Sequence, residues 1–159
     1  MNILAIDPGA TTGWVVYDSE AGRVLAAGHF RDHHMDVSHD GPIEWCVIER
    51  PKGYGPTRPQ LVECGIVFGR LVEHLQRLRG PVQEMLRMDI CRILSDACHG
   101  QIRVRNDATA WAAVLHLHGG FDAAAKGGPL HGVKSHSRAA LAAAVAACLQ
   151  RDEQSNLSH

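Results

Sequence analysis

Two acidic side chains each stand at the end of a short apolar run. Asp7 follows residues 3–6, and Glu49 closes the run 44–49. Such runs are typical of strands buried on both faces of a sheet. Carboxylates that converge from separate strands repel each other unless a cation lies between them, and hard divalent cations prefer oxygen ligands. The pair therefore predicts a metal site, where two ions could activate a water and stabilise the leaving oxygen of a phosphodiester.

A sharp turn follows the first acid. Pro8 and Gly9 reverse the chain, and the second apolar run, residues 14–17, completes a hairpin with Asp7 at its mouth. We expect Gly9 and Gly13 to leave room for backbone to approach a ligand. The other interpretation is that Asp7 merely caps a surface turn.

Cationic side chains lie in two glycine-rich loops. The loop 50–58 follows Glu49 directly and mixes glycine, proline and an aromatic ring with three cations, and the loop 126–134 precedes the last helix. This composition suits contact with a phosphate backbone. The cations that we expect to contact DNA from these loops are Arg50, Lys52, Arg58 and Lys134.

The elements that must position these residues alternate between strand and helix patterns. Pro59 suits a first helical position, and Asn106 with Asp107 would cap a later helix. The alanine-rich final helix implies close packing on a sheet, and the polar tail 151–159 is expected to fray. Strands are predicted over 3–6, 14–17, 23–30, 44–49 and 82–86, and helices over 59–79, 89–98, 108–118 and 135–149.

Composition limits the class of protein. With 159 residues and 45% hydrophobic content, the chain is expected to form one domain over residues 1–150. No apolar run approaches the roughly 20 residues that a membrane span needs. The five cysteines show no CxxC spacing, which favours buried thiols in a reducing compartment over disulfides or zinc. Net charge is −1, but residues 50–105 carry ten basic and five acidic side chains, which is compatible with a DNA-facing surface and also with ordinary scatter.

With these residues in view, the chain resembles the RuvC-like Holliday junction resolvases, particularly phage-type members, of the ribonuclease H-like superfamily. The resemblance covers most of the chain in element order. It rests on Ile6-Asp7-Pro8-Gly9 with Thr12-Gly13, on the strand end Val47-Ile48-Glu49, and on Gly128-Pro129-Leu130 with Gly132-Val133 before the last helix.

The resemblance implies an α/β fold: a mixed five-stranded sheet, its first three strands antiparallel, with helices on both faces. It implies a metal-dependent, structure-selective endonuclease that cuts four-way or branched DNA with two Mg²⁺ or Mn²⁺ ions. A homodimer is expected, because a four-way junction presents two equivalent strands, and the helix with Gly65 and Gly69 is its candidate interface. The protein would be cytoplasmic, bacterial or phage-encoded. The catalytic and metal-binding residues would be Asp7, Glu49 and His136, and the helical DNA contacts Arg92 and Arg138.

The last helix departs from the family pattern. Many resolvases begin it with two aspartates three residues apart, but alignment on Ala140-Leu141-Ala142 places His136 and Ala139 there. His136 could be a metal ligand, a general base, or only a capping residue. The missing acid leaves open a junction-binding protein that no longer cuts. A second rival is an actin- or hexokinase-like phosphotransferase, since those relatives share a first hairpin with an Asp-Gly turn. The second needs another phosphate loop and usually another domain, for which the chain is too short.

Overall fold

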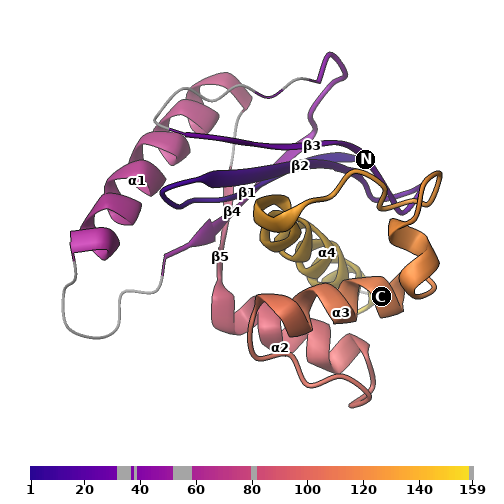
Figure 1. Cartoon of the computed structure of the whole chain (residues 1–159). Coiled ribbons are helices and arrows are strands. Elements are labelled where there is room, and N and C mark those ends of the chain that lie inside the picture. The colour runs from indigo at the N-terminus through magenta and orange to yellow at the C-terminus, as the bar shows by residue number, and fades with distance from the viewer. Residues whose placement is uncertain (32–36, 38, 52–58, 80–81, 158–159) are drawn as a thin grey trace.

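The mixed five-stranded sheet is confirmed. A computed structural model of the chain describes residues 1–31, 37, 39–51, 59–79 and 82–157. The strand order is β3-β2-β1-β4-β5, so β1 (Asn2–Asp7) lies at the centre (Figure 1). The first three strands pair antiparallel, and β1, β4 and β5 are parallel. The other strands are β2 (Thr12–Asp18), β3 (Arg23–Phe30), β4 (Trp45–Arg50) and β5 (Val82–Leu86).

Helices cover both faces of the sheet, as predicted (Figure 1). The helix α1 (Pro59–Arg79) packs on one face, where Leu71 and Leu75 are buried against the strands. The other face is covered by α4 (Ser135–Asn156), with α2 (Arg87–Ala97) and α3 (Asp107–Leu117) packed on that helix. A short 3₁₀ turn, η1 (Phe121–Ala124), links α3 to the final loop.

The central strand alternates between the two core layers. Ile3 and Ala5 of β1 face the α4 side, whereas Leu4 and Ile6 face the α1 side. This period of two is the reason why the apolar run is continuous. The alanines of α4 are fully buried between residues 140 and 147, so this helix lies close against the sheet, as its composition predicts.

Gly13 serves a different purpose from the one predicted. A side chain at Gly13 would collide with the backbone carbonyl of His136, at the start of α4. Its missing side chain therefore admits the N-terminus of α4 rather than a ligand. The close packing of α4 on β2 begins at this contact.

The prediction for the polar end of the last helix was also wrong. Instead of ending near Leu149 and fraying, α4 continues to Asn156 with residues 151–156 exposed. Helix formation needs only backbone hydrogen bonds, and this segment contains neither glycine nor proline to stop it.

Among the described helices, none is long and apolar enough to cross a membrane.

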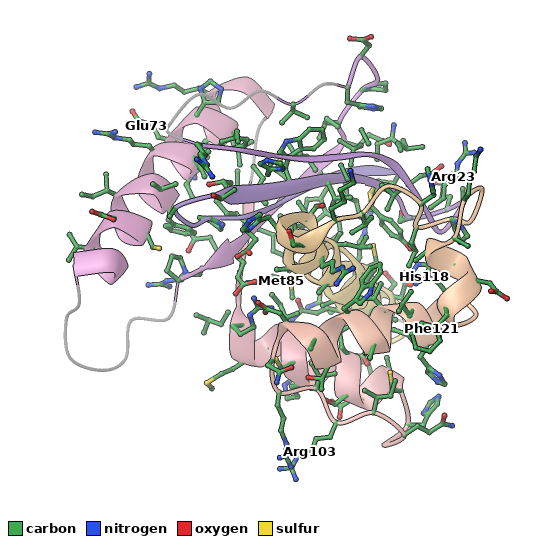
Figure 2. The ribbon with its side chains drawn as sticks, in the orientation of Figure 1. Arg23, Glu73, Met85, Arg103, His118 and Phe121 are labelled. Atoms are coloured by element: carbon green, nitrogen blue, oxygen red, sulfur yellow. The ribbon has the colours of Figure 1, made fainter. Side chains whose placement is uncertain are left out.

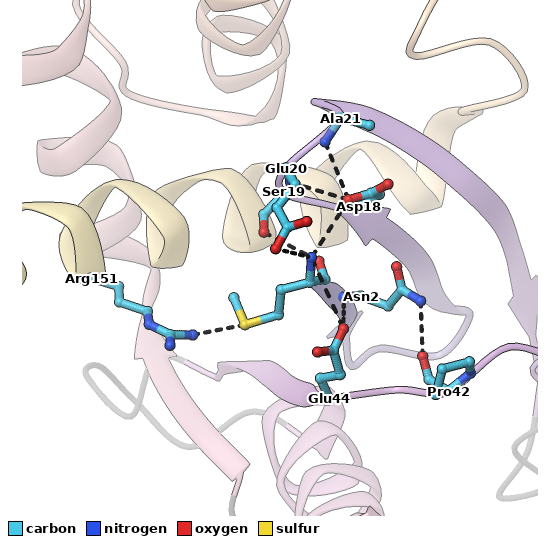
Figure 3. Close-up of polar contacts among 9 residues, drawn as sticks. Asn2, Asp18, Ser19, Glu20, Ala21, Pro42, Glu44 and Arg151 are labelled. Atoms are coloured by element: carbon cyan, nitrogen blue, oxygen red, sulfur yellow. Dashed lines mark hydrogen bonds and ion pairs between the residues drawn. The ribbon is translucent and has the colours of Figure 1, made fainter.

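The start of β1 is anchored by a cluster of ion pairs (Figure 3). The ammonium of Met1 lies 3.6 Å from Asp18, 3.2 Å from Glu20 and 4.0 Å from Glu44. The backbone N–H of Asn2 donates to Glu44 at 2.7 Å. These contacts join the start of β1 to the end of β2 and to the chain before β4. They therefore fix the strand whose other end carries Asp7.

Candidate functional site

Asp7 and Glu49 lie side by side at the carboxyl ends of two neighbouring parallel strands. Ile6 of β1 is in register with Ile48 of β4, and each acid is the next residue of its strand. Both isoleucines face α1, so strand alternation directs both acids to the opposite face, where α2, α3 and α4 pack. The convergence that the sequence predicted is present in the fold.

An arginine that the sequence analysis missed joins this pair. Arg87 is the first residue of α2 and directly follows β5, whose parallel pairing with β4 brings it to the same sheet edge. Its Nε donates to Glu49 Oε1 at 2.8 Å, and its Nη2 donates to Asp107 Oδ1 at 2.7 Å. Arg87 therefore bridges a strand-end acid to an acid of α3.

Asp107 was predicted to help cap α3, but Asn106 performs the capping. The side chain of Asn106 accepts from the backbone N–H of Thr109 at 3.0 Å, and the Thr109 hydroxyl accepts from the N–H of Asn106 at 3.0 Å. This reciprocal capping box leaves the carboxylate of Asp107 available to Arg87. Asp107 thus belongs to the charge cluster of the site.

Burial dominates the electrostatics of the two strand-end acids. Burial raises the pKa of Asp7 to about 6, although Arg87 acts in the opposite direction. Burial, followed by the charge of Asp7, raises the pKa of Glu49 to about 8. The ion pair with Arg87 alone would lower the pKa of Glu49, so desolvation outweighs it here. The site therefore stabilises added positive charge.

The donor set fits a hard divalent cation. Three carboxylates facing one guanidinium leave a formal charge of −2 when all are ionised. Glu49 Oε2 is buried and has no hydrogen-bond partner among the described residues. Within that same part of the chain, no three His, Cys, Asp or Glu side chains are grouped to hold a metal. Asp7 and Glu49 would thus be the protein ligands, and Mg²⁺ is often held by one or two carboxylates together with water and phosphate oxygens.

A hollow lined by arginines adjoins the acids. It has a volume of about 470 Å³ and lies between α2 and residues 103–105, where Arg103 extends into solvent (Figure 2). Arg87 lines this hollow as well as bridging Glu49 and Asp107. Predicted Arg92 lies here too, 3.9 Å from Asp89 and 3.8 Å from Asp96. The arginines of the hollow are Arg87, Arg92, Arg103 and Arg105.

His136 lies in a different hollow. It is the second residue of α4, exposed, with its ring centroid 6.0 Å from that of His29 on β3. Both histidines and Lys134 line a cavity of about 890 Å³ along β3, and neither Asp7 nor Glu49 lines it. The backbone of His136, in contrast, lies against Gly13, the partner of Asp7 across the hairpin. Its predicted role as ligand or base stays a prediction.

Among the described residues, two further predicted DNA contacts are exposed on separate elements, β4 and α4. Arg50 is exposed at the end of β4, 4.0 Å from Glu84. The guanidinium of Arg138 lies 4.9 Å from the ring centroid of Trp111 on α3. Lys52 and Arg58 lie outside the described residues. Their loop follows β4, whose end carries Glu49.

Comparison with solved structures identifies the fold. Thermus thermophilus RuvC in complex with a Holliday junction substrate is similar over 95% of this chain and 95% of its own, with a TM-score of 0.61 and 16% identity. A second Thermus thermophilus RuvC structure covers 96% of this chain and 97% of its own, with a TM-score of 0.60 and 18% identity. No protein-family model and no curated protein sequence matches.

The chain therefore has the RuvC-like, ribonuclease H-like fold over nearly its whole length. The predicted element order and sheet topology agree with that assignment. At this level of identity the likeness concerns the fold, and any activity must be argued from the side chains of the site.

Proposed function

We propose that this protein is a metal-dependent, structure-selective endonuclease that cuts four-way or otherwise branched DNA. The observation that carries the proposal is the acid pair Asp7 and Glu49 beside the arginine hollow, with Arg87 common to both. Carboxylates hold the cation that phosphodiester hydrolysis needs, and arginines hold the phosphate backbone. The RuvC structure with this fold is bound to a Holliday junction, which favours branched DNA as the substrate.

Each group has a defined task in this proposal. Asp7 and Glu49 would hold a divalent ion, Mg²⁺ or Mn²⁺, which would supply Lewis-acid activation of a water and stabilise charge on the phosphate. Arg92, Arg103 and Arg105 hold the backbone of the DNA strand that enters the site. The proposal also includes a second metal ion and a catalytic role for His136. The carboxylates of the described residues do not require either of them.

A homodimer completes the proposed enzyme, because symmetric cutting of a junction needs two active sites. The outer face of α1 presents Val62 and Ile66, each 49% exposed. Gly65 and Gly69 lie on the same face, and a side chain added at either glycine would meet nothing within 4 Å. Small residues beside exposed apolar ones suit close packing against a second copy of α1.

The test is a cleavage assay on labelled four-way, forked and linear duplex DNA with Mg²⁺, Mn²⁺ or EDTA. Wild type is expected to cut the branched substrates only when a divalent ion is present. Asp7→Asn is expected to abolish cutting while junction binding stays intact or becomes slightly tighter, because one negative charge near the phosphates is lost. Equal cutting by wild type and Asp7→Asn would place the active site elsewhere.

A binding protein that no longer cuts is the second candidate. It is favoured by Ala139, which stands where many resolvases have an acid, and by the guanidinium that already pairs with Glu49. In that case, wild type and Asp7→Asn would bind junctions with similar affinity, and neither would release a cleavage product with either metal.

A further inference from the structure

Arg87 lies where a cation would neutralise the acid pair. Its guanidinium covers Glu49, whose side chain is only 9% exposed, while the carboxylate of Asp107 at the other end of the bridge is 71% exposed. Arg87 itself is 23% exposed. The bridge therefore runs from a buried acid to a solvent-exposed one.

Not every buried polar atom in the ion-pair cluster of Glu49, Arg87 and Asp107 is hydrogen-bonded within the described residues. In the part of the chain that the structure describes, both Glu49 Oε2 and Arg87 Nη1 are buried without hydrogen-bond partners. A buried acceptor without a partner favours a cation, and a buried donor without a partner favours an anion. A divalent metal ion would suit the acceptor, Glu49 Oε2, and a DNA phosphate would suit the donor, Arg87 Nη1. Both atoms are buried while Arg87 covers Glu49, so binding of either ligand to them requires the guanidinium to move.

We propose that Arg87 is a displaceable counter-ion: it occupies the cation's place on Glu49 and moves to a DNA phosphate when the metal binds. Asp107 is the positioning residue that keeps Arg87 within reach during the exchange. The inference deepens the proposed nuclease function and rests on it. Metal and DNA then bind cooperatively, because phosphate draws Arg87 away from Glu49 and the metal takes the vacated carboxylate.

The test measures Mn²⁺ affinity from the electron paramagnetic resonance signal of free Mn²⁺, with and without a four-way junction. Without DNA, Arg87→Met is expected to bind Mn²⁺ about 10- to 100-fold more tightly than wild type, the range for loss of one competing charged hydrogen bond. Asp107→Asn is expected to bind Mn²⁺ more weakly, because Arg87 then pairs with Glu49 alone. The exchange predicts opposite signs for these two variants, and the changes in charge alone would produce the same signs.

Arg87→Lys separates displacement from a simple field effect. It keeps the charge, but a single ammonium cannot reproduce the forked bridge between two carboxylates. Displacement predicts tighter Mn²⁺ binding by Arg87→Lys than by wild type, whereas a field effect predicts equal affinity. Arg77→Met is the matched control, because Arg77 forms an exposed pair with Glu73 on α1, at 2.6 Å. Its Mn²⁺ affinity should equal that of wild type.

The DNA arm distinguishes this inference from the proposed function. Wild type should bind Mn²⁺ more tightly when the junction is present, and Arg87→Met should lose that gain. If wild type binds no branched DNA, the proposed function fails, and the order of Mn²⁺ affinities still decides the role of Arg87. If wild type cuts junctions but Arg87→Met and Arg87→Lys bind Mn²⁺ as wild type does, the nuclease stands and the exchange is wrong. Failure of every variant to bind Mn²⁺ contradicts both.

Discussion

At the scale of single residues, the site is defined by carboxylates whose surroundings disfavour their charge. Glu49 is 7% exposed and lies close enough to Asp7 for the two charges to interact. One guanidinium offsets part of this cost. An acid pair held in this state binds a proton or a metal more readily than an exposed pair would.

Stability of the metal-free protein is therefore expected to fall as the pH rises. The pKa of Glu49 is about 8 in the folded chain and near its ordinary value of 4.5 when unfolded. Between pH 4.5 and pH 8, the folded chain therefore holds a proton on Glu49 that the unfolded chain has released. The contribution of Glu49 to the free energy of unfolding is fully present below pH 4.5 and is lost as the pH rises through 8. Glu49→Gln imitates the protonated acid and should be more stable than wild type by about 1 to 3 kcal/mol at pH 9.

Urea unfolding in EDTA at pH 5 and pH 9 measures this difference, which should nearly vanish at pH 5. Glu84→Gln serves as the control, because Glu84 is exposed on the neighbouring strand β5. A Glu49→Gln variant that is less stable than wild type at pH 9 would show that the Arg87 ion pair outweighs burial.

His136 has three candidate roles that substitution separates. As a metal ligand it should tolerate Asp with a shift of preference from Mn²⁺ toward Mg²⁺, because Mg²⁺ favours oxygen. As a general base it should lose activity on the same substitution, and the wild-type rate should fall at low pH. Single-turnover cleavage by His136→Asp and His136→Ala with both metals measures this. Unchanged cutting by His136→Ala would leave only a structural role.

At the scale of elements, the contact between β2 and α4 sets how close the last helix comes to the sheet. Gly13→Ala would press a methyl group against the backbone of His136, so it should destabilise the fold by about 3 kcal/mol. Thermal unfolding of wild type and Gly13→Ala measures this difference. An unchanged unfolding midpoint would show that this contact does not set the distance between α4 and the sheet.

The hollow beside α2 supplies the second test at this scale. Arg103 and Arg105 are exposed and line it. Replacing both with alanine should make the slope of log affinity against log salt shallower by up to about two, since each duplex phosphate contact contributes about −0.9. Junction binding titrated over a range of salt measures the slope. An unchanged slope would remove the hollow from the DNA surface.

Some elements and site residues can be predicted from the sequence better than others. Asp7 and Glu49 could be found because each ends a run of apolar residues, and the strand order then follows from short connections. Arg87 was missed because it lies at the junction between β5 and α2, where neither the periodicity of a strand nor that of a helix applies. Its position right after a third parallel strand was the available signal. Asp107 was missed because Asn106 and Asp107 both suit a cap, and only the observed hydrogen bonds distinguish them.

At the scale of the whole molecule, the exposed face of α1 predicts a dimer. Ile66→Arg places a charge in that face and should convert a dimer into a monomer, as measured by analytical ultracentrifugation. Phe121→Arg is the control, because Phe121 is an exposed apolar residue, 85% accessible, on η1 (Figure 2). Dimers that survive Ile66→Arg would place the interface elsewhere.

The order of assembly during translation follows from the packing of α4 on β1. The strand that carries Asp7 leaves the ribosome before α4, yet one face of it is covered by that helix. Until residues 135–156 emerge, the nascent chain must keep that apolar face uncovered, at synthesis rates of about 5–20 residues per second. A chain truncated before α4 should therefore aggregate, because the apolar face of the sheet would stay exposed to solvent.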